Sequence, residues 1–365
     1  MTIQSKNPVG LDGVVAASTA LSQVDGERGE LIIAGQRVGD LAYAVSFETL
    51  AARLWSLANG GAAEGPSIAT DLGRARSLAF TRLSPVLAVV AGMPATDAFR
   101  AAIAVLRPED GVPDELVLTG GAAVITAALV RMKEGEAPVA PNPSLGHAAD
   151  LLRMMRGTPP SPAEAAALDA YLVTASDHGM NASTFAARVV ASTQADLFMA
   201  VTAAYCALSG PLHGGAPGPV LDMLDAIGTR ERIRPWVDNA LAQGQRLMGF
   251  GHRIYRVRDP RADVLKRAAE TLGTRRHGGS EPGLAAEVEA YARAALARAK
   301  PDRPLDTNVE FFTAILLDGL DIPRSAFTPV FAAARTIGWI GHAREQQRTG
   351  RLLRPASVYT GAMPG

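Results

Sequence analysis

The sequence is poor in cysteine, in aromatic residues and in net charge. Cys206 is the single cysteine among 365 residues, which excludes an intrachain disulfide and a thiolate metal cluster and fits a reducing compartment. Lysine plus arginine equals aspartate plus glutamate at 36 each, so we expect neither nucleic acid nor an anionic membrane as a partner. Aromatic residues make up only 5%. Small side chains must therefore fill much of the core, which favours closely packed helices.

No segment has the features of a targeting peptide or a membrane span. The amino-terminal residues MTIQSKNPVG contain no apolar stretch, and we interpret no later stretch as membrane-spanning. We therefore expect a cytoplasmic protein. The length of 365 residues suggests about two domains, because a domain commonly has about 150 residues.

The spacing of apolar residues predicts an all-α fold with one small β-hairpin near the amino terminus. Residues 24–26 and 30–33 predict the hairpin, with a glycine in its turn. Ser46 can cap one helix, and Ser161-Pro162-Ala163-Glu164 predicts the start of another that ends near Gly179. Further helices are expected at 181–208, 219–227, 260–272, 284–298, 308–319 and 328–346, and loops at 58–66, 107–113 and 134–146.

Three of the six histidines lie next to glycine: His178, His213 and His252. Glycine marks places where the backbone bends and where a small molecule can approach closely. His213 precedes a helix expected to begin near 217–219, whose positive end disfavours a charged imidazole. A neutral imidazole can donate a hydrogen bond to a carbonyl oxygen, as in enolising enzymes. For each histidine alone, a loop position or a helix cap is the alternative.

Several common motifs are missing. No H-x-x-x-H or H-E-x-x-H spacing and no cysteine pair occurs, so we expect no structural or catalytic metal and no bound cofactor. The sequence also contains no Walker loop, dinucleotide-binding glycine motif or nucleophile elbow. These absences argue against a kinase, a dehydrogenase and an esterase.

Arginines gather in residues 246–267 and again from 335 to 354. In a chain without net charge, such clusters predict anionic small ligands, because arginine binds carboxylates and phosphates in a bidentate manner. A solvated helix face is the alternative. Arg261 is the most suggestive, because Asp259-Pro260 predicts a helix start that places Arg261 in the first turn. The helix dipole disfavours a cation there, so a bound anion would explain it.

Glu310 is the acidic candidate, and two interpretations compete for it. Its spacing from Thr307 is that of a capping box. Taken alone, this spacing favours the capping interpretation. A carboxylate beside two phenylalanines in a closing cleft could also act as the base for a carbon acid.

These motifs resemble the citrate synthase family, and the resemblance runs almost from end to end. The segments GLDGVV and DGERG are followed by SDHGMN, PLHGGA, GFGHRIYRVRDPRA, NVEFF and the tail from Phe327, in the order and spacing of that family. Each motif alone is weak. Chance does not readily produce five of them in the right order.

The resemblance implies a role for each candidate residue. His213 matches the histidine that hydrogen-bonds the thioester oxygen of acetyl-CoA, and His252 matches the one that polarises the carbonyl of oxaloacetate. Glu310 stands where the family usually has an aspartate as general base. The implied oxaloacetate-binding residues are His178, Asn181, Arg261, Arg335 and Arg354, the last acting across a dimer interface. The implied CoA-binding residues are Arg256 and Arg303.

Glutamate at position 310 is the main departure from the family pattern. Its extra methylene lengthens the side chain by roughly 1.5 Å, and a misplacement of about 1 Å can slow a reaction on the order of 10²-fold. Because the other residues match, we expect the site to have adjusted to glutamate.

The resemblance also implies the architecture. We expect a helical large domain at 1–215 and 321–365, and a helical small domain at 216–320 that closes over the substrates. A homodimer with active sites near its interface is expected.

The function expected from the resemblance is that of citrate synthase, which condenses acetyl-CoA with oxaloacetate and hydrolyses citryl-CoA to citrate and CoA. The first alternative is 2-methylcitrate synthase, which uses propionyl-CoA and the same residues. One methylene in an apolar pocket is worth only about 1–3 kcal/mol, so the two are hard to separate. The second alternative is a non-catalytic paralog that binds CoA or a dicarboxylate, which the intact set of histidines and arginines argues against.

Overall fold

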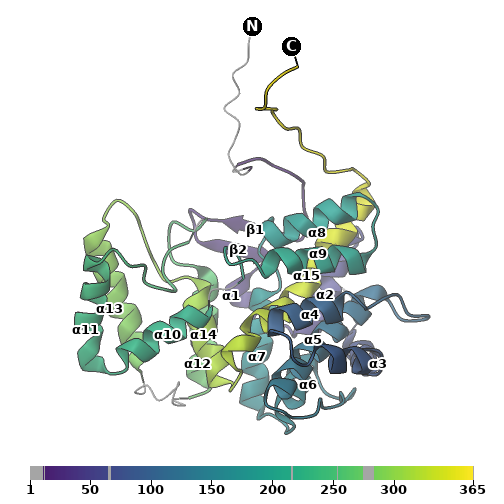
Figure 1. The fold of residues 1–365 in the computed structure, drawn as a ribbon, viewed down its shortest axis with the longest axis horizontal. Helices are drawn as coiled ribbons and strands as arrows, with labels where there is room; N and C mark the ends of the chain where they lie inside the picture. The colour runs from purple at the N-terminus through teal and green to yellow at the C-terminus, as the bar shows by residue number, and fades with distance from the viewer. Residues whose placement is uncertain are drawn as a thin grey trace.

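The computed structural model describes residues 11, 13–64, 67–214, 217–252, 254–273 and 283–364. Motif residues 10, 12, 215, 216 and 253 lie outside this part of the chain. Helices dominate the described residues, which confirms the all-α prediction (Figure 1). The helices are α1 (Val38–Leu41), α2 (Phe47–Ala58), α3 (Ala69–Val90), α4 (Ala95–Ile103), α5 (Asp114–Lys133), α6 (His147–Arg156), α7 (Pro162–Ala175), α8 (Ala182–Ser192), α9 (Leu197–Leu208), α10 (Pro217–Ile227), α11 (Arg230–Ala242), α12 (Pro260–Thr271), α13 (Leu284–Ala299), α14 (Val309–Gly319) and α15 (Phe327–Thr349).

The predicted hairpin is part of a three-stranded antiparallel sheet. Strands β1 (Ser22–Asp25), β2 (Glu30–Ile33) and β3 (Gln36–Arg37) follow one another in sequence order. The turn between β1 and β2 packs against another part of the chain, because a Cβ on Gly26 would lie 2.3 Å from the Ile254 carbonyl oxygen. The Arg256 amide donates to the Gly26 carbonyl at 2.9 Å. The sheet therefore supports the loop that carries His252.

The two predicted helix starts are confirmed. The Ser46 hydroxyl caps α2 by accepting from the Thr49 amide, and Ser161 and Glu164 form both halves of a capping box at the start of α7. Burial raises the pKa of Glu164, but hydrogen bonds from Ser161 and Arg156 outweigh it and lower that pKa to about 2. Helix α7 ends at Ala175, earlier than expected, and the residues that follow form a turn at the candidate site.

From residue 181 onward, one predicted helix is wrong and one helix was not predicted. The expected helix at 181–208 is two helices, α8 and α9. Gln194 has a positive φ of 66°, and Asp196 caps the new helix by accepting from the Met199 amide at 2.8 Å. Helix α11 was not predicted, because it has Pro235 in its interior and a largely polar sequence.

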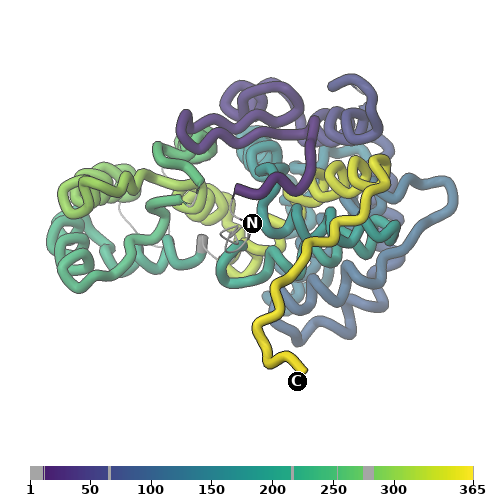
Figure 2. The backbone as a smooth tube through the Cα atoms, turned by 90° about the horizontal axis from the view of Figure 1, so that it is seen from above, coloured from purple at the N-terminus to yellow at the C-terminus, as the bar shows by residue number. Residues whose placement is uncertain are grey.

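Helix α15 is the central element of the larger group of helices. It packs against α2, α5, α7, α8 and α9, and most of its residues are buried. At Gly338 a Cβ would lie 2.3 Å from the Ser176 carbonyl oxygen. This close approach brings α15 against the turn after α7. Beyond α15, the tail 351–364 contains no helix or strand. It begins against α8, where the Leu353 amide donates to the Ser192 hydroxyl at 3.0 Å, and its end runs out beyond the helices (Figures 1 and 2).

Helices α10, α11 and α13 form a second group on the left of Figure 1, and α12 and α14 lie between that group and α7. Helix α5 is long and apolar enough to cross a membrane by length and composition alone. Its apolar window is 83% buried inside the protein, as in the core helix of a globular domain.

Candidate active site

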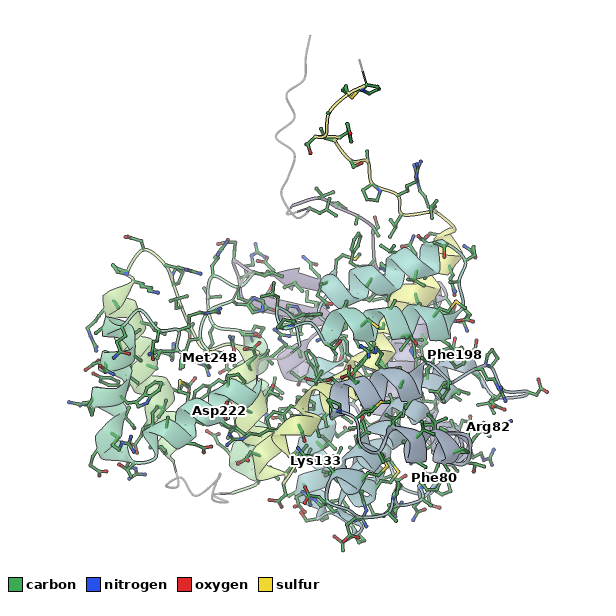
Figure 3. All side chains as sticks on the ribbon, viewed as in Figure 1. Phe80, Arg82, Lys133, Phe198, Asp222 and Met248 are labelled. Atoms are coloured by element: carbon green, nitrogen blue, oxygen red, sulfur yellow. The ribbon has the colours of Figure 1, made fainter. Side chains whose placement is uncertain are left out.

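Two turns from distant parts of the sequence bring three rings together. His178 lies in the turn between α7 and α8, and His252 and Tyr255 lie in the segment that leads into α12. The ring centroids of His178 and His252 are 5.7 Å apart, and His178 Nε2 lies 3.1 Å from the Tyr255 hydroxyl. Met248, labelled in Figure 3, marks the start of the segment that carries His252. The two predicted oxaloacetate histidines are therefore neighbours.

His252 is held as a neutral imidazole with its proton on Nε2. Its Nδ1 accepts hydrogen bonds from the backbone amides of Ile254 at 3.0 Å and Tyr255 at 3.2 Å, so the proton must be on the other ring nitrogen. Burial, together with the charge of Arg261, lowers the pKa of His252 to about 4. The ring can thus donate from Nε2 to a carbonyl oxygen.

His178 is also held neutral, and it lies among the other predicted residues. Burial is the main cause that lowers its pKa well below the usual value, and the nearby charges of Arg261, Arg335, His252 and His213 lower it further. Its backbone amide donates to Asp177 Oδ1 at 2.8 Å. The structure therefore places four other predicted site residues within electrostatic range of His178.

His213 is half-buried and is held by the first turn of α8. Its Nε2 lies 2.8 Å from the Ser183 hydroxyl, and that hydroxyl donates to Asn181 Oδ1 at 2.8 Å. Trp339 Nε1 donates to the same hydroxyl at 3.1 Å. Helix α10 begins at Pro217, as expected, so its positive end follows His213 closely in sequence.

Asn181 orders the turn that carries His178. Its Oδ1 caps α8 by accepting from the Thr184 amide at 3.0 Å, while its Nδ2 donates to the His178 carbonyl at 3.4 Å. The same side chain thus links the His178 turn to Ser183, the partner of His213. The contacts of Asn181 thus order the turn that carries His178, and its expected binding of oxaloacetate stays a prediction.

Arg261 lies in the first turn of α12, as expected, and is almost fully buried. Its guanidinium forms a bidentate pair with Asp259, at 3.0 Å from Nε to Oδ1 and 2.7 Å from Nη2 to Oδ2. Asp259 also caps α12 and accepts from the Val309 amide at 3.2 Å. Asp259 therefore balances the unfavourable helix dipole and joins α12 to the start of α14, which carries Glu310.

The prediction of a capping box between Thr307 and Glu310 is wrong. Asn308 is the N-cap of α14, and its Oδ1 accepts from the Glu310 amide at 3.0 Å. Thr307 instead donates its hydroxyl proton to Glu289 at 2.9 Å. Burial raises the pKa of Glu310, although Arg261 and Arg246 act in the opposite direction. A carboxylate in this environment is a stronger base than one in water.

Arg335 projects from α15 to the same region. Its Nε donates to the Ala175 carbonyl at 2.6 Å, and its guanidinium carbon lies 4.7 Å from the centre of the Phe331 ring. Burial lowers its pKa to about 10, partly offset by the negative charge of Asp177. Arg335 therefore stays charged at neutral pH and can bind a carboxylate.

The remaining predicted residues do not join this group in the single chain. Arg354 is exposed in the extended tail, and Arg256 and Arg303 are both exposed. Their roles stay predictions. Among the described residues, no group of three or more His, Cys, Asp or Glu side chains could hold a metal ion.

Sequence reasoning missed the residues that hold the predicted ones in place. Tyr255 contacts His178, Ser183 contacts His213, and Asp259 contacts Arg261. Behind the His178 turn, the Asp177 carboxylate accepts from His342 Nε2 at 3.2 Å, and His342 Nδ1 accepts from Arg188 Nε at 3.0 Å. No local pattern marks these partners, because 165 residues separate Asp177 from His342 and 154 separate Arg188 from His342.

Comparisons with known proteins give one consistent family. The model of the "Citrate synthase, C-terminal domain" family matches residues 10–356. A citrate synthase of Haloferax volcanii is 36% identical over 367 residues, covering 96% of this chain and 95% of the relative. A 2-methylcitrate synthase of Mycobacterium tuberculosis is 37% identical over 366 residues, covering 96% and 90%.

Solved structures give the same result. The ternary complex of carboxymethyl coenzyme A and oxaloacetate with citrate synthase from Thermoplasma acidophilum has a TM-score of 0.85 and 26% identity, covering 98% of this chain and 97% of that one. Fold, motifs and comparisons therefore agree, and this chain belongs to the citrate synthase family, a family of enzymes that condense an acyl-CoA with a second substrate.

Proposed function

We propose that this chain is a citrate synthase that joins the methyl carbon of acetyl-CoA to the keto carbon of oxaloacetate. The observation that carries the proposal is that the site contains both a hydrogen-bond donor for a carbonyl oxygen and a base for a C–H proton. His252 is a neutral imidazole whose Nε2 proton can be donated to a carbonyl, and Glu310 is a half-buried carboxyl with a raised pKa. Condensation at a carbon acid needs such an electrophilic donor and such a base.

The proposed reaction uses these residues in order. Glu310 removes a proton from the methyl group of acetyl-CoA, and His213 stabilises the enolate oxygen that forms. The enolate carbon then attacks the keto carbon of oxaloacetate, and the electron pair of that C=O bond moves onto its oxygen, to which His252 donates a hydrogen bond. The oxygen takes up a proton through His252, which balances the proton that Glu310 removed and gives the hydroxyl of citryl-CoA. Water hydrolyses the resulting citryl thioester, which gives citrate and CoA.

The buried arginines fit the dicarboxylate substrate. Arg261 and Arg335 are both buried and charged, and arginine pairs with carboxylates most strongly where water is excluded. Closure of α10–α14 over the turns at His178 and His213 would exclude water. This closure corresponds to the expected small domain at 216–320 moving against 1–215 and 321–365.

The second candidate is 2-methylcitrate synthase, because a relative of that name is as similar as the citrate synthases. The two activities are separated by release of free thiol from acetyl-CoA and from propionyl-CoA, each with oxaloacetate. We expect a higher kcat/KM with acetyl-CoA. A higher value with propionyl-CoA would assign the chain to 2-methylcitrate synthase. No release from either, with CoA still bound in a calorimeter, would indicate a non-catalytic binding protein.

We also propose a homodimer in which Arg354 completes the site of the partner. Large apolar side chains are exposed on one protomer, including Val89 on α3 at 76% and Met199 on α9 at 60%. Contact with a second protomer that covered these side chains would remove their apolar area from water. Arg354 is exposed and directly follows Leu353, whose amide donates to the Ser192 hydroxyl at the end of α8 at 3.0 Å. Its side chain is therefore held at the surface of its own protomer, where a second protomer can cover it.

Mixing two inactive variants tests this arrangement. Glu310→Gln removes the base from its own site, and Arg354→Ala removes the arginine from the partner's site. When subunits exchange in an equal mixture, half of the dimers are mixed, and each contains one complete site. We therefore expect about a quarter of wild-type activity to return. If Arg354 served its own protomer, mixing would restore nothing.

A further inference from the structure

Tyr255 is placed between His178, His252 and Arg261. Its side chain is 2% exposed. The centre of its ring lies 4.8 Å from the His252 ring and 5.6 Å from the His178 ring. The guanidinium carbon of Arg261 lies 5.9 Å from the same ring. A residue that touches three substrate-binding candidates is in a position to set their arrangement.

The hydroxyl of Tyr255 connects two segments that are 77 residues apart, through its 3.1 Å hydrogen bond to His178 Nε2. Burial raises the pKa of Tyr255 and is also the main cause that lowers the pKa of His178. Both groups are therefore uncharged at neutral pH, and the contact is a hydrogen bond between two neutral groups. Such a bond fixes the orientation of the imidazole without changing the charge of the site.

The backbone of Tyr255 acts on the second histidine. Its amide is one of the two donors to His252 Nδ1, which places the His252 proton on Nε2. One residue thus fixes the tautomer of His252 through its backbone and the orientation of His178 through its side chain. A substitution that keeps the backbone separates the two effects.

We propose that Tyr255 is a positioning residue for the dicarboxylate substrate, whose hydroxyl holds the His178 imidazole in the orientation that binds a substrate carboxylate. The inference rests on the proposed function, because it concerns the same site. It differs from a packing role, which the aromatic ring alone would fulfil. Phenylalanine keeps that ring and removes only the hydroxyl.

The test is Tyr255→Phe, followed by steady-state kinetics and by calorimetric titration with oxaloacetate. We expect the KM and the Kd for oxaloacetate to rise about 5- to 10-fold, the loss expected for one neutral hydrogen bond. The KM for acetyl-CoA should rise by less than about 2-fold. Tyr205→Phe is the matched control, because Tyr205 is buried and donates to the Thr96 carbonyl at 2.9 Å. This control should leave both KM values unchanged.

A double-mutant cycle decides whether Tyr255 acts through His178. In a His178→Ala background, Tyr255→Phe should raise the Kd for oxaloacetate no further. A second 5- to 10-fold rise in that background would mean direct contact with the substrate and would overturn the positioning role. An unchanged Kd in the single Tyr255→Phe variant would overturn it as well.

The binding measurement keeps this inference separate from the proposed reaction. If the wild-type protein binds oxaloacetate but releases no thiol, the proposed reaction fails, and the Kd values still test Tyr255. If the wild-type protein does not bind oxaloacetate, both ideas fail together. Thiol release by the wild type with an unchanged Kd in Tyr255→Phe overturns the inference alone.

Discussion

Glu310→Gln is expected to lower kcat by about 10³-fold, within the range observed when a general acid or base is removed. The amide of glutamine has almost the same shape as the carboxyl group but cannot accept the methyl proton of acetyl-CoA. Glu310 contributes to the start of α14 through its backbone amide, which donates to Asn308. Glutamine keeps that hydrogen bond. The loss should therefore appear as lower kcat in the thiol-release assay with little change in the KM for oxaloacetate.

The pH dependence of the wild type checks the same assignment. Burial raises the pKa of Glu310, so its carboxyl holds a proton at a higher pH than an ordinary carboxyl does. The base form is thus lost earlier on acidification. We expect the acidic limb of kcat to lie above the ordinary pKa of about 4.3 for glutamate. A limb below that value would contradict the role of Glu310 as base.

The stability of Glu310→Gln serves as its control. A carboxyl with a pKa raised in the folded state binds its proton more tightly there than in the unfolded chain. Its stabilising contribution is therefore present below the unfolded pKa and is lost as the pH rises through the folded pKa. At neutral pH the glutamine variant should melt no lower than the wild type. A marked fall in Tm would assign the lost activity to misfolding.

Glu310→Asp tests how the site accommodates a glutamate. Aspartate shortens the side chain by roughly 1.5 Å, and a base displaced by about 1 Å can lose on the order of 10² in rate. We expect an activity between those of the wild type and the glutamine variant. An aspartate variant as fast as the wild type would mean that the site has not adjusted to glutamate.

The sequence predicted the residues that face the proposed ligands better than the residues that support them. His178, His252 and Arg261 have local signals, namely adjacent glycines and a proline-started helix. Asp177 and His342 lie far apart in the chain and meet only because α15 packs against the turn after α7. A contact that depends on tertiary packing has no short-range sequence pattern from which it could be predicted.

Local signals also misled at particular positions. The spacing of Thr307 and Glu310 matched a capping box, but Asn308 between them took the cap, because a short amide side chain serves this position at least as well as threonine. The run at 181–208 is interrupted by the polar stretch Ser192-Thr193-Gln194, and Asp196 after it caps the second helix, but the apolar residues on both sides favour a single helix. Helix assignment from apolar content is therefore least reliable where two helices follow one another closely.

Arg188→Met is expected to lower the free energy of unfolding by about 3–5 kcal/mol, the cost of leaving a buried charge without its partner. Arg188 is 1% exposed and Glu345 is 3% exposed, and the two form an ion pair. Glu345 also accepts from the Ala20 amide at 2.8 Å. Removing the guanidinium strands the carboxylate of Glu345 and takes from His342 the donor to its Nδ1.

The same loss should reach the substrate site. His342 donates to Asp177, and Asp177 accepts from the backbone amide of His178. When the donor from Arg188 is removed, the His342 ring is less constrained, and so is the turn that carries His178. We therefore expect Arg188→Met to raise the KM for oxaloacetate more than the KM for acetyl-CoA. The measurements are urea unfolding followed by circular dichroism, and steady-state kinetics.

Two further variants separate charge from packing in this prediction. Arg230→Met breaks an exposed pair with Glu287, in which both side chains are 48% exposed, so it should cost no more than about 1 kcal/mol. Adding Glu345→Gln to Arg188→Met removes the unpaired buried charge. Burying a neutral side chain costs less free energy than burying an unpaired carboxylate, so the double variant should regain part of the lost stability. If the double variant were no more stable than Arg188→Met, the loss would come from the missing packing of the arginine side chain.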